Sequence, residues 1–177
     1  MQEEIENSVN RQGHKYHISY DLWEMNEGIH LYSLASIYSA FDSILNIYKA
    51  LGKNVSEFEN NRLKEEKLLT QLKKYINENL YDEEKKSYVR NTEDRKMDIS
   101  ILGAITPFNM FKPKEKKIRN TVERINMSLR TYTGGYQRFE QDNYMYGNPW
   151  PIANLWMTLY YLETGEKKKA KESFDFV

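Results

Sequence analysis

The chain has 177 residues, a length suited to a single domain, and we expect one domain over residues 1–177. Lysine plus arginine number 26, as do aspartate plus glutamate, so the formal net charge is zero. This balance argues against nucleic acid or a membrane surface as a partner, because both select a basic face. No apolar run approaches the roughly 20 residues of a spanning helix, and the acidic start at Met1 lacks a signal-peptide pattern, so we expect a cytoplasmic location.

The chain contains no cysteine, which excludes disulfides, thiolate metal ligands and a cysteine nucleophile. His14, His17 and His30 lack metal-ligand spacing and no glycine-rich phosphate loop occurs, so we expect neither a metal nor a cofactor. Aromatic residues make up 14% of the chain, and 14 of them are tyrosines. Such side chains suit sugar-stacking sites and wet interfaces, but they also suit an ordinary core, so composition leaves both interpretations open.

Apolar residues recur at steps of three and four, which predicts amphipathic helices rather than strands. The predicted stripes cover residues 34–51, 68–80, 98–105, 118–129, 152–160 and 166–177. Asp98 is expected to cap the third helix and Pro107 to stop it, while Gly134-Gly135 predicts a turn. The pattern indicates an all-α fold of antiparallel helical hairpins.

Three linkers are longer and richer in aromatic or acidic residues than the others, namely Ser19–Gly28, Tyr81–Met97 and Tyr132–Trp150. Alternate loops of antiparallel hairpins lie at the same end, so we expect these three to gather on one face. Long ordered loops in compact domains are usually functional. The charge runs 64–67, 83–86, 114–117 and 166–169 are interpreted as solvated helix ends.

The first candidate site is Asp21-Leu-Trp23-Glu24-Met25. A glutamate beside a tryptophan at the mouth of a helix can be desolvated, which favours the protonated form that a general acid for glycosidic cleavage needs. The alternative is a structural pair, with the tryptophan as a hydrophobic staple and the glutamate as a helix cap.

The second candidate is the glycine-punctuated segment from Gly134 to Trp150. Arg138 and Asp142 could clamp sugar hydroxyls, with Trp150 as a stacking platform. A structural Arg138–Asp142 salt bridge beside a core tryptophan is the equally weighted alternative.

Taken together, these segments resemble glucoamylase-type glycoside hydrolases of family 15. Asp21-Leu-Trp-Glu24 followed by Gly28-Ile-His-Leu-Tyr-Ser-Leu-Ala resembles the acid-bearing motif, and Met97-Asp98-Ile-Ser-Ile-Leu-Gly resembles a helix start of that family. Arg138-Phe-Glu-Gln-Asp142-Asn-Tyr144-Met-Tyr-Gly-Asn-Pro-Trp150 resembles its Arg-Tyr-x-x-Asp-x-Tyr-x-x-Gly-Asn-Pro-Trp loop, with matching spacing. The resemblance covers roughly residues 19–165.

The resemblance implies a glycosidase with an (α/α)6 barrel, of which this chain would form about six of twelve helices, and no β-sandwich domain. It implies Glu24 as general acid, and Trp23, Arg138, Asp142, Tyr144 and Trp150 as substrate-binding residues around one pocket. The implied substrate is an α-glucan or oligosaccharide, with α-1,4, α-1,6 and trehalose linkages all open, hydrolysed with inversion in polysaccharide degradation and carbohydrate metabolism.

Two departures from the family pattern bear on activity. Met25 stands where many fungal members carry a second glutamate that contacts substrate, which leaves the substrate preference open. The family's general base and an upstream arginine–aspartate pair have no match in this chain, so we expect a fragment of low activity that associates with itself or with a complementary fragment. A non-catalytic carbohydrate-binding or regulatory remnant, and a helical interaction scaffold, remain as alternatives.

Overall fold

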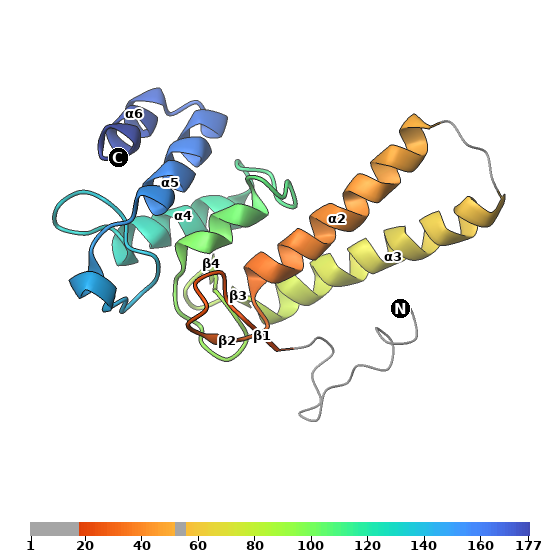
Figure 1. Ribbon diagram of the computed structural model, residues 1–177, viewed down its shortest axis with the longest axis horizontal. Helices are drawn as coiled ribbons and strands as arrows, with labels where there is room; N and C mark the ends of the chain where they lie inside the picture. Colours follow the sequence, from red (N-terminus) through yellow and green to blue (C-terminus); the bar gives the residue numbers. More distant parts are fainter. Residues whose placement is uncertain (1–17, 52–55) are drawn as a thin grey trace.

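The computed structural model describes residues 18–51 and 56–177, and its described part is mostly helical (Figure 1). The helices are α2 (Leu31–Ala50), α3 (Ser56–Asn79), η1 (Ile99–Ala104), α4 (Lys116–Ser128), η2 (Tyr144–Gly147), α5 (Pro151–Thr164) and α6 (Lys167–Asp175). Two antiparallel hairpins of two-residue strands accompany them, β1 (Ser19–Tyr20) with β2 (Glu27–Gly28) and β3 (Tyr81–Asp82) with β4 (Ser87–Tyr88). The predicted helical class is confirmed, whereas these hairpins are too short to produce an alternating pattern and were not predicted.

The α2–α3 hairpin projects from the rest of the molecule (Figure 1). Helix α3 begins at Ser56, twelve residues before the apolar stripe that predicted it, because its first turns are polar and give no stripe. The charge run 64–67 therefore lies inside α3 and not at a helix end, and the run 83–86 forms the turn between β3 and β4. Both interpretations as helix ends were wrong.

The third predicted helix is the short 3-10 helix η1, whose six residues are all buried. Asp98 is its N-cap and accepts a hydrogen bond from the Ser100 backbone N–H, as predicted. Helix η1 packs against both α2 and α5. This central helix joins the α2–α3 hairpin to the bundle of α4, α5 and α6.

The three long linkers, which we expected on one face, contact one another: Arg90 of the second donates to Asn26 of the first, and the backbone N–H of Glu140 in the third donates to the carbonyl of Met97 in the second. His30 forms an isolated antiparallel bridge with Asn91, and Asp98 forms one with Phe139. The Ile99 backbone N–H donates to the carbonyl of Arg138 at 2.8 Å, which fixes the start of η1 against the third linker. The fold thus brings the two candidate segments to one region.

One face of α5 is apolar and exposed, with side chains that recur at helical spacing. These are Ile152, Leu155, Leu159 and Leu162, and their exposed fractions run from 38% to 54%. An isolated exposed leucine needs no explanation, but an aligned stripe is typical of an interaction surface. Within the part of the chain that the structure describes, no helix combines the length and the apolarity needed to span a bilayer.

Candidate active site

The first candidate segment is the tip of the β1–β2 hairpin, which the buried carboxylate of Asp21 organises. Oδ1 of Asp21 accepts hydrogen bonds from the backbone N–H groups of Trp23 at 3.0 Å and Met25 at 2.9 Å. Its Oδ2 accepts from the Asn26 side chain at 2.6 Å. An aspartate that binds backbone groups a few residues ahead stabilises a tight turn, so the sequence Asp21–Asn26 folds locally into this loop.

Glu24 stands at this tip, and its backbone is in the left-handed region with φ of 56°. Its side chain is exposed, and α2 begins only at Leu31. The prediction that Glu24 lies at the mouth of a helix is therefore wrong, and so is the alternative of a helix-capping glutamate. The chain by itself does not desolvate this carboxyl group, which leaves it accessible to a ligand.

Trp23, in contrast, points back into the molecule and is half-buried. Its indole Nε1–H donates to both carboxylate oxygens of Asp98, at 3.2 and 3.1 Å. Its ring lies 6.3 Å from that of Trp150 and 6.4 Å from that of Trp156, between centroids. Trp23 thus links the first candidate segment to η1 and to the second candidate segment.

In the second segment, Arg138 and Asp142 form a two-pronged ion pair. Nε and Nη2 of Arg138 each donate at 2.8 Å, to Oδ2 and Oδ1 of Asp142, and the two side chains are 6% and 0% exposed. Oδ1 of Asp142 also accepts from the Tyr144 backbone N–H. The salt bridge that sequence reasoning offered as the structural alternative is therefore present. It leaves Nη1 of Arg138 without a hydrogen-bond partner among the described residues.

Four aromatic rings surround the Arg138 guanidinium. Its carbon Cζ lies 4.6 Å from the ring centroid of Trp150, 5.1 Å from those of Tyr144 and Phe139, and 5.5 Å from that of Trp23. Tyr144 and Trp150 are also in contact, at 5.8 Å between ring centroids. We call Trp23, Arg138, Asp142, Tyr144 and Trp150 the aromatic cluster. Five of the six predicted site residues meet in it, and Glu24 is attached to it through its neighbour Trp23.

Asp98 lies beneath the aromatic cluster and is 1% exposed. Desolvation by burial raises the pKa of Asp98 to about 6, against the opposing effects of the Ser100 and Trp23 hydrogen bonds and the charge of Arg90. Sequence reasoning identified Asp98 only as a helix cap. Its bond to Trp23 was missed, because nothing in the sequence shows which indole faces a given carboxylate.

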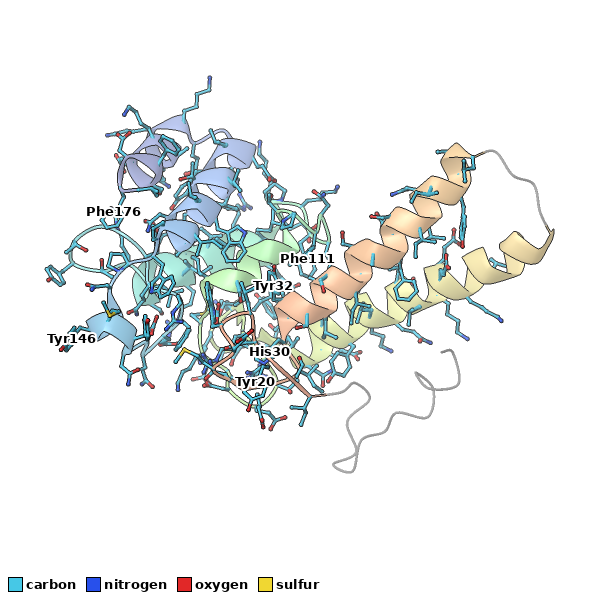
Figure 2. All side chains as sticks on the ribbon, in the orientation of Figure 1. Tyr20, His30, Tyr32, Phe111, Tyr146 and Phe176 are labelled. Atoms are coloured by element: carbon cyan, nitrogen blue, oxygen red, sulfur yellow. The ribbon has the colours of Figure 1, made fainter. Side chains whose placement is uncertain are left out.

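Arg90 and His30 both contact Asn26 of the β1–β2 hairpin. His30 lies at the start of α2 (Figure 2). Nη2 of Arg90 donates to the Asn26 side chain at 3.1 Å and to Asp94, whereas Nε and Nη1 are buried without a partner among the described residues. His30 Nε2 lies 3.0 Å from the carbonyl oxygen of Asn26, and burial lowers the pKa of this imidazole. A neutral His30 with a proton on Nε2 fits this contact. Sequence reasoning did not identify Arg90.

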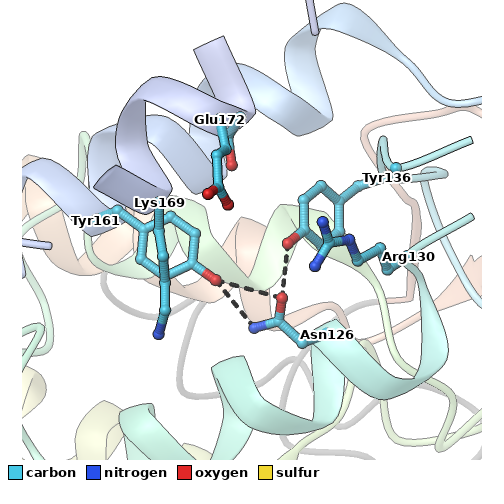
Figure 3. A pocket seen from close by; sticks show the side chains of 8 residues that line it. Asn126, Arg130, Tyr136, Tyr161, Lys169 and Glu172 are labelled. Carbon is cyan, nitrogen blue, oxygen red and sulfur yellow. Dashed lines mark hydrogen bonds between the residues drawn. The ribbon is translucent and has the colours of Figure 1, made fainter. Parts of the chain in front are cut away.

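A cavity of about 260 Å³, drawn in Figure 3, has none of the aromatic-cluster residues in its lining. Its lining residues are Asn126, Arg130, Gly134, Tyr136, Tyr161, Lys169, Glu172 and Ser173. The Asn126 side chain joins the hydroxyl groups of Tyr136 and Tyr161 across one wall. Tyr136 connects the two regions, because its backbone carbonyl accepts from the Trp150 N–H at 2.9 Å while its side chain enters the cavity wall.

In the described part of the chain, no three histidine, aspartate or glutamate side chains are grouped so as to hold a metal ion. His14 and His17 lie outside the described residues.

Residues 9–175 match the family described as Glycosyl hydrolases family 15. An uncharacterized glycosyl hydrolase of Methanocaldococcus jannaschii is 30% identical over 156 residues, which are 86% of this chain and 24% of that protein.

Among solved structures, a wild-type glycosidase aligns with a TM-score of 0.75 at 16% identity, over 89% of this chain and 40% of its own. A variant glycosidase in complex with glucose gives the same values. The chain thus spans about a quarter of the curated relative and two fifths of these structures. The structural likeness supports a partial helical barrel of the glycosidase type, and the sequence match over nearly the whole length shows that the chain belongs to glycosyl hydrolases family 15.

Proposed function

We propose that this chain supplies the general acid and a glucose-binding wall of a glucoamylase-like glycosidase that removes terminal α-linked glucose from α-glucans with inversion. The observation that carries the proposal is the contact of Trp23 with Arg138 and Trp150, at 5.5 and 6.3 Å. Residues far apart in sequence bring aromatic rings together around one guanidinium, and aromatic faces with a few hydrogen-bonding groups are the chemistry that binds a sugar ring.

In this proposal Glu24 protonates the glycosidic oxygen. The Glu24 side chain is exposed on a turn that Asp21 holds in place, so a glycosidic oxygen can reach its carboxyl group. Nη1 of Arg138 is the donor available to a sugar hydroxyl, while the ion pair with Asp142 keeps the guanidinium plane fixed. Tyr144 and Trp150 supply the stacking faces.

Inversion also requires a second carboxylate that activates water, at roughly 6.5–9.5 Å from the acid. We assign no described residue to that role, so we propose that the isolated chain binds sugar better than it cleaves it. The family's other barrel elements, supplied by further polypeptide, would complete the catalytic pair.

The test has a binding arm and a turnover arm. Adding maltose, maltooligosaccharides or trehalose is expected to change the tryptophan fluorescence, and Trp150→Ala is expected to abolish the change while Glu24→Gln preserves it. Glucose release, however slow, should disappear in Glu24→Gln and persist in Glu27→Gln, a control on the same hairpin. Release that survives Glu24→Gln would show that another group is the acid.

A non-catalytic carbohydrate-binding role is the second candidate. The buried Arg138–Asp142 pair and the aromatic cluster are fully assembled in this chain, whereas Glu24 lies in solvent. This role requires sugar binding that depends on Trp150 and no glucose release above background. The absence of any saccharide-induced change would instead favour the interaction scaffold.

A further inference from the structure

We infer that Asp98 is the positioning residue of this site: its carboxylate holds the Trp23 indole in the orientation that the aromatic cluster requires. The inference deepens the proposed function and rests on it for the identity of the ligand. Asp98 itself lies beneath Trp23 with almost no exposed surface, so it acts through the indole and not on a sugar.

The geometry of Asp98 joins three segments at one carboxylate. Its oxygens accept from Trp23 Nε1, which belongs to the hairpin that carries Glu24, and from the Ser100 backbone N–H of η1. The next residue, Ile99, donates its backbone N–H to the Arg138 carbonyl. A displacement of Asp98 would therefore move Trp23 relative to Arg138.

The hydrogen bonds from Ser100 and from Trp23 use different acceptor atoms of the Asp98 carboxylate. Ser100 N–H reaches Oδ1 alone at 2.8 Å, whereas the indole N–H lies between both oxygens. Asp98→Asn keeps an oxygen for Ser100 and places an NH₂ group at 3.1 Å from the indole nitrogen if the geometry is kept. Two donors then face each other, so this variant retains the helix cap and loosens Trp23.

Protonation of Asp98 turns one of its acceptor oxygens into a donor, as Asp98→Asn does. The Trp23 indole N–H should therefore respond to pH in the wild-type protein, without any substitution. Burial raises the pKa of Asp98 to about 6, within reach of a titration of the folded protein. The segments packed around Asp98 carry further charged groups, namely Asp21, Glu24, His30, Arg90, Asp94, Arg138, Glu140 and Asp142. Among these groups His30 is an imidazole whose pKa burial lowers from its ordinary value, so a control must separate its titration from that of Asp98.

The experiment follows the three indole N–H signals of the whole chain in ¹H–¹⁵N spectra between pH 4.5 and 8. The signal of Trp23 is the one lost in Trp23→Phe. We expect it to shift with a midpoint near pH 6, to lose that shift in Asp98→Asn, and to keep it in Asp82→Asn. Asp82 is a matched control, since its carboxylate caps the β3–β4 turn and contacts Arg95 but no indole.

A Trp23 signal that does not titrate, or that titrates equally in Asp98→Asn, would overturn the inference; the second result would point to His30. In the binding arm, Asp98→Asn should weaken sugar binding about tenfold, the effect of one lost hydrogen bond of ordinary strength, and Asp82→Asn should not. A titrating indole in a chain that binds no sugar would uphold the positioning of Trp23 and reject the proposed function.

Discussion

Arg138 and Asp142 are joined by two hydrogen bonds of 2.8 Å, and neither side chain is more than 6% exposed. The pair has a structural consequence as well as a proposed binding role. The Arg138 charge is surrounded by the rings of Trp23, Phe139, Tyr144 and Trp150 and has no other carboxylate within bonding distance among the described residues.

Asp142→Asn should destabilise the fold by about 3–5 kcal/mol, because it leaves a buried guanidinium without its counter-charge. Urea denaturation followed by tryptophan fluorescence measures this loss. Asp175→Asn is the control, since it breaks the exposed Lys171–Asp175 pair on α6 and should change the unfolding free energy by less than about 0.5 kcal/mol. Equal effects of the two variants would show that the Arg138–Asp142 pair is not buried as described.

The β1–β2 hairpin carries the buried carboxylate of Asp21, which holds the turn, and the exposed carboxylate of Glu24, which we propose as the general acid. Asp21→Ala should cost about 1–3 kcal/mol, because it leaves the N–H groups of Trp23 and Met25 without their acceptor. Glu24→Gln should leave the unfolding free energy within about 0.5 kcal/mol of the wild type, since Glu24 is exposed.

Glu24→Gly extends this comparison, because glycine adopts the left-handed backbone found at Glu24 without strain. We expect a stability equal to or up to about 1 kcal/mol above that of the wild type, with glucose release abolished. Thermal unfolding and the glucose assay on the same sample measure both. A strongly destabilised Glu24→Gly would contradict the backbone conformation described here.

The buried carboxyl of Asp98 makes stability depend on pH. Its pKa is about 6 in the folded protein and 3.8 for an unperturbed aspartate. Between about pH 4 and 6 the folded state keeps a proton that the unfolded state has released, so stability falls as the pH rises through this window. A pKa difference of this size corresponds to about 3 kcal/mol.

Comparison with Asp98→Asn isolates this effect, because the other groups titrate in both proteins. The unfolding free energy of the wild type minus that of Asp98→Asn should fall as the pH is raised from 4 to 7 and then stay level. Urea denaturation at four pH values measures the difference. A difference that rises with pH would mean that the folded protein favours the charged form of Asp98.

Gly28 of the β1–β2 hairpin packs closely against Asn91, in the loop that follows β4. A Cβ atom at Gly28 would lie 2.8 Å from Cγ of Asn91, which is fully buried and accepts from the backbone N–H groups of Glu93 and Asp94. Gly28→Ala should therefore cost about 1–3 kcal/mol through overpacking and weaken sugar binding. Gly134→Ala, at a φ of 99° with open space around it, should show only the backbone cost of about 1 kcal/mol and serves as the control.

The exposed stripe of α5 predicts association of the chain with a second copy. Sedimentation velocity should reveal a weight-average mass that rises with concentration, and Leu155→Lys with Leu159→Lys should reduce it. Met127→Lys on α4 is the control, because Met127 is 77% exposed outside that stripe. A monomer at all concentrations would contradict the prediction.

The sequence by itself determined the helical class and most of the helices, for a physical reason. Apolar residues at helical spacing over a dozen or more positions indicate which face of a helix is buried. The spacing of Arg138, Asp142 and Trp150 indicates a local loop. Where that signal is weak it failed, as in the polar start of α3 and the two-residue strands around Glu24. Only the tertiary structure decided that Glu24 is exposed, that Arg138 and Asp142 bond to each other, and that Asp98 holds Trp23. The Asp98–Trp23 contact joins segments far apart in the chain, and it depends on how η1 packs against its neighbours, which no local pattern records.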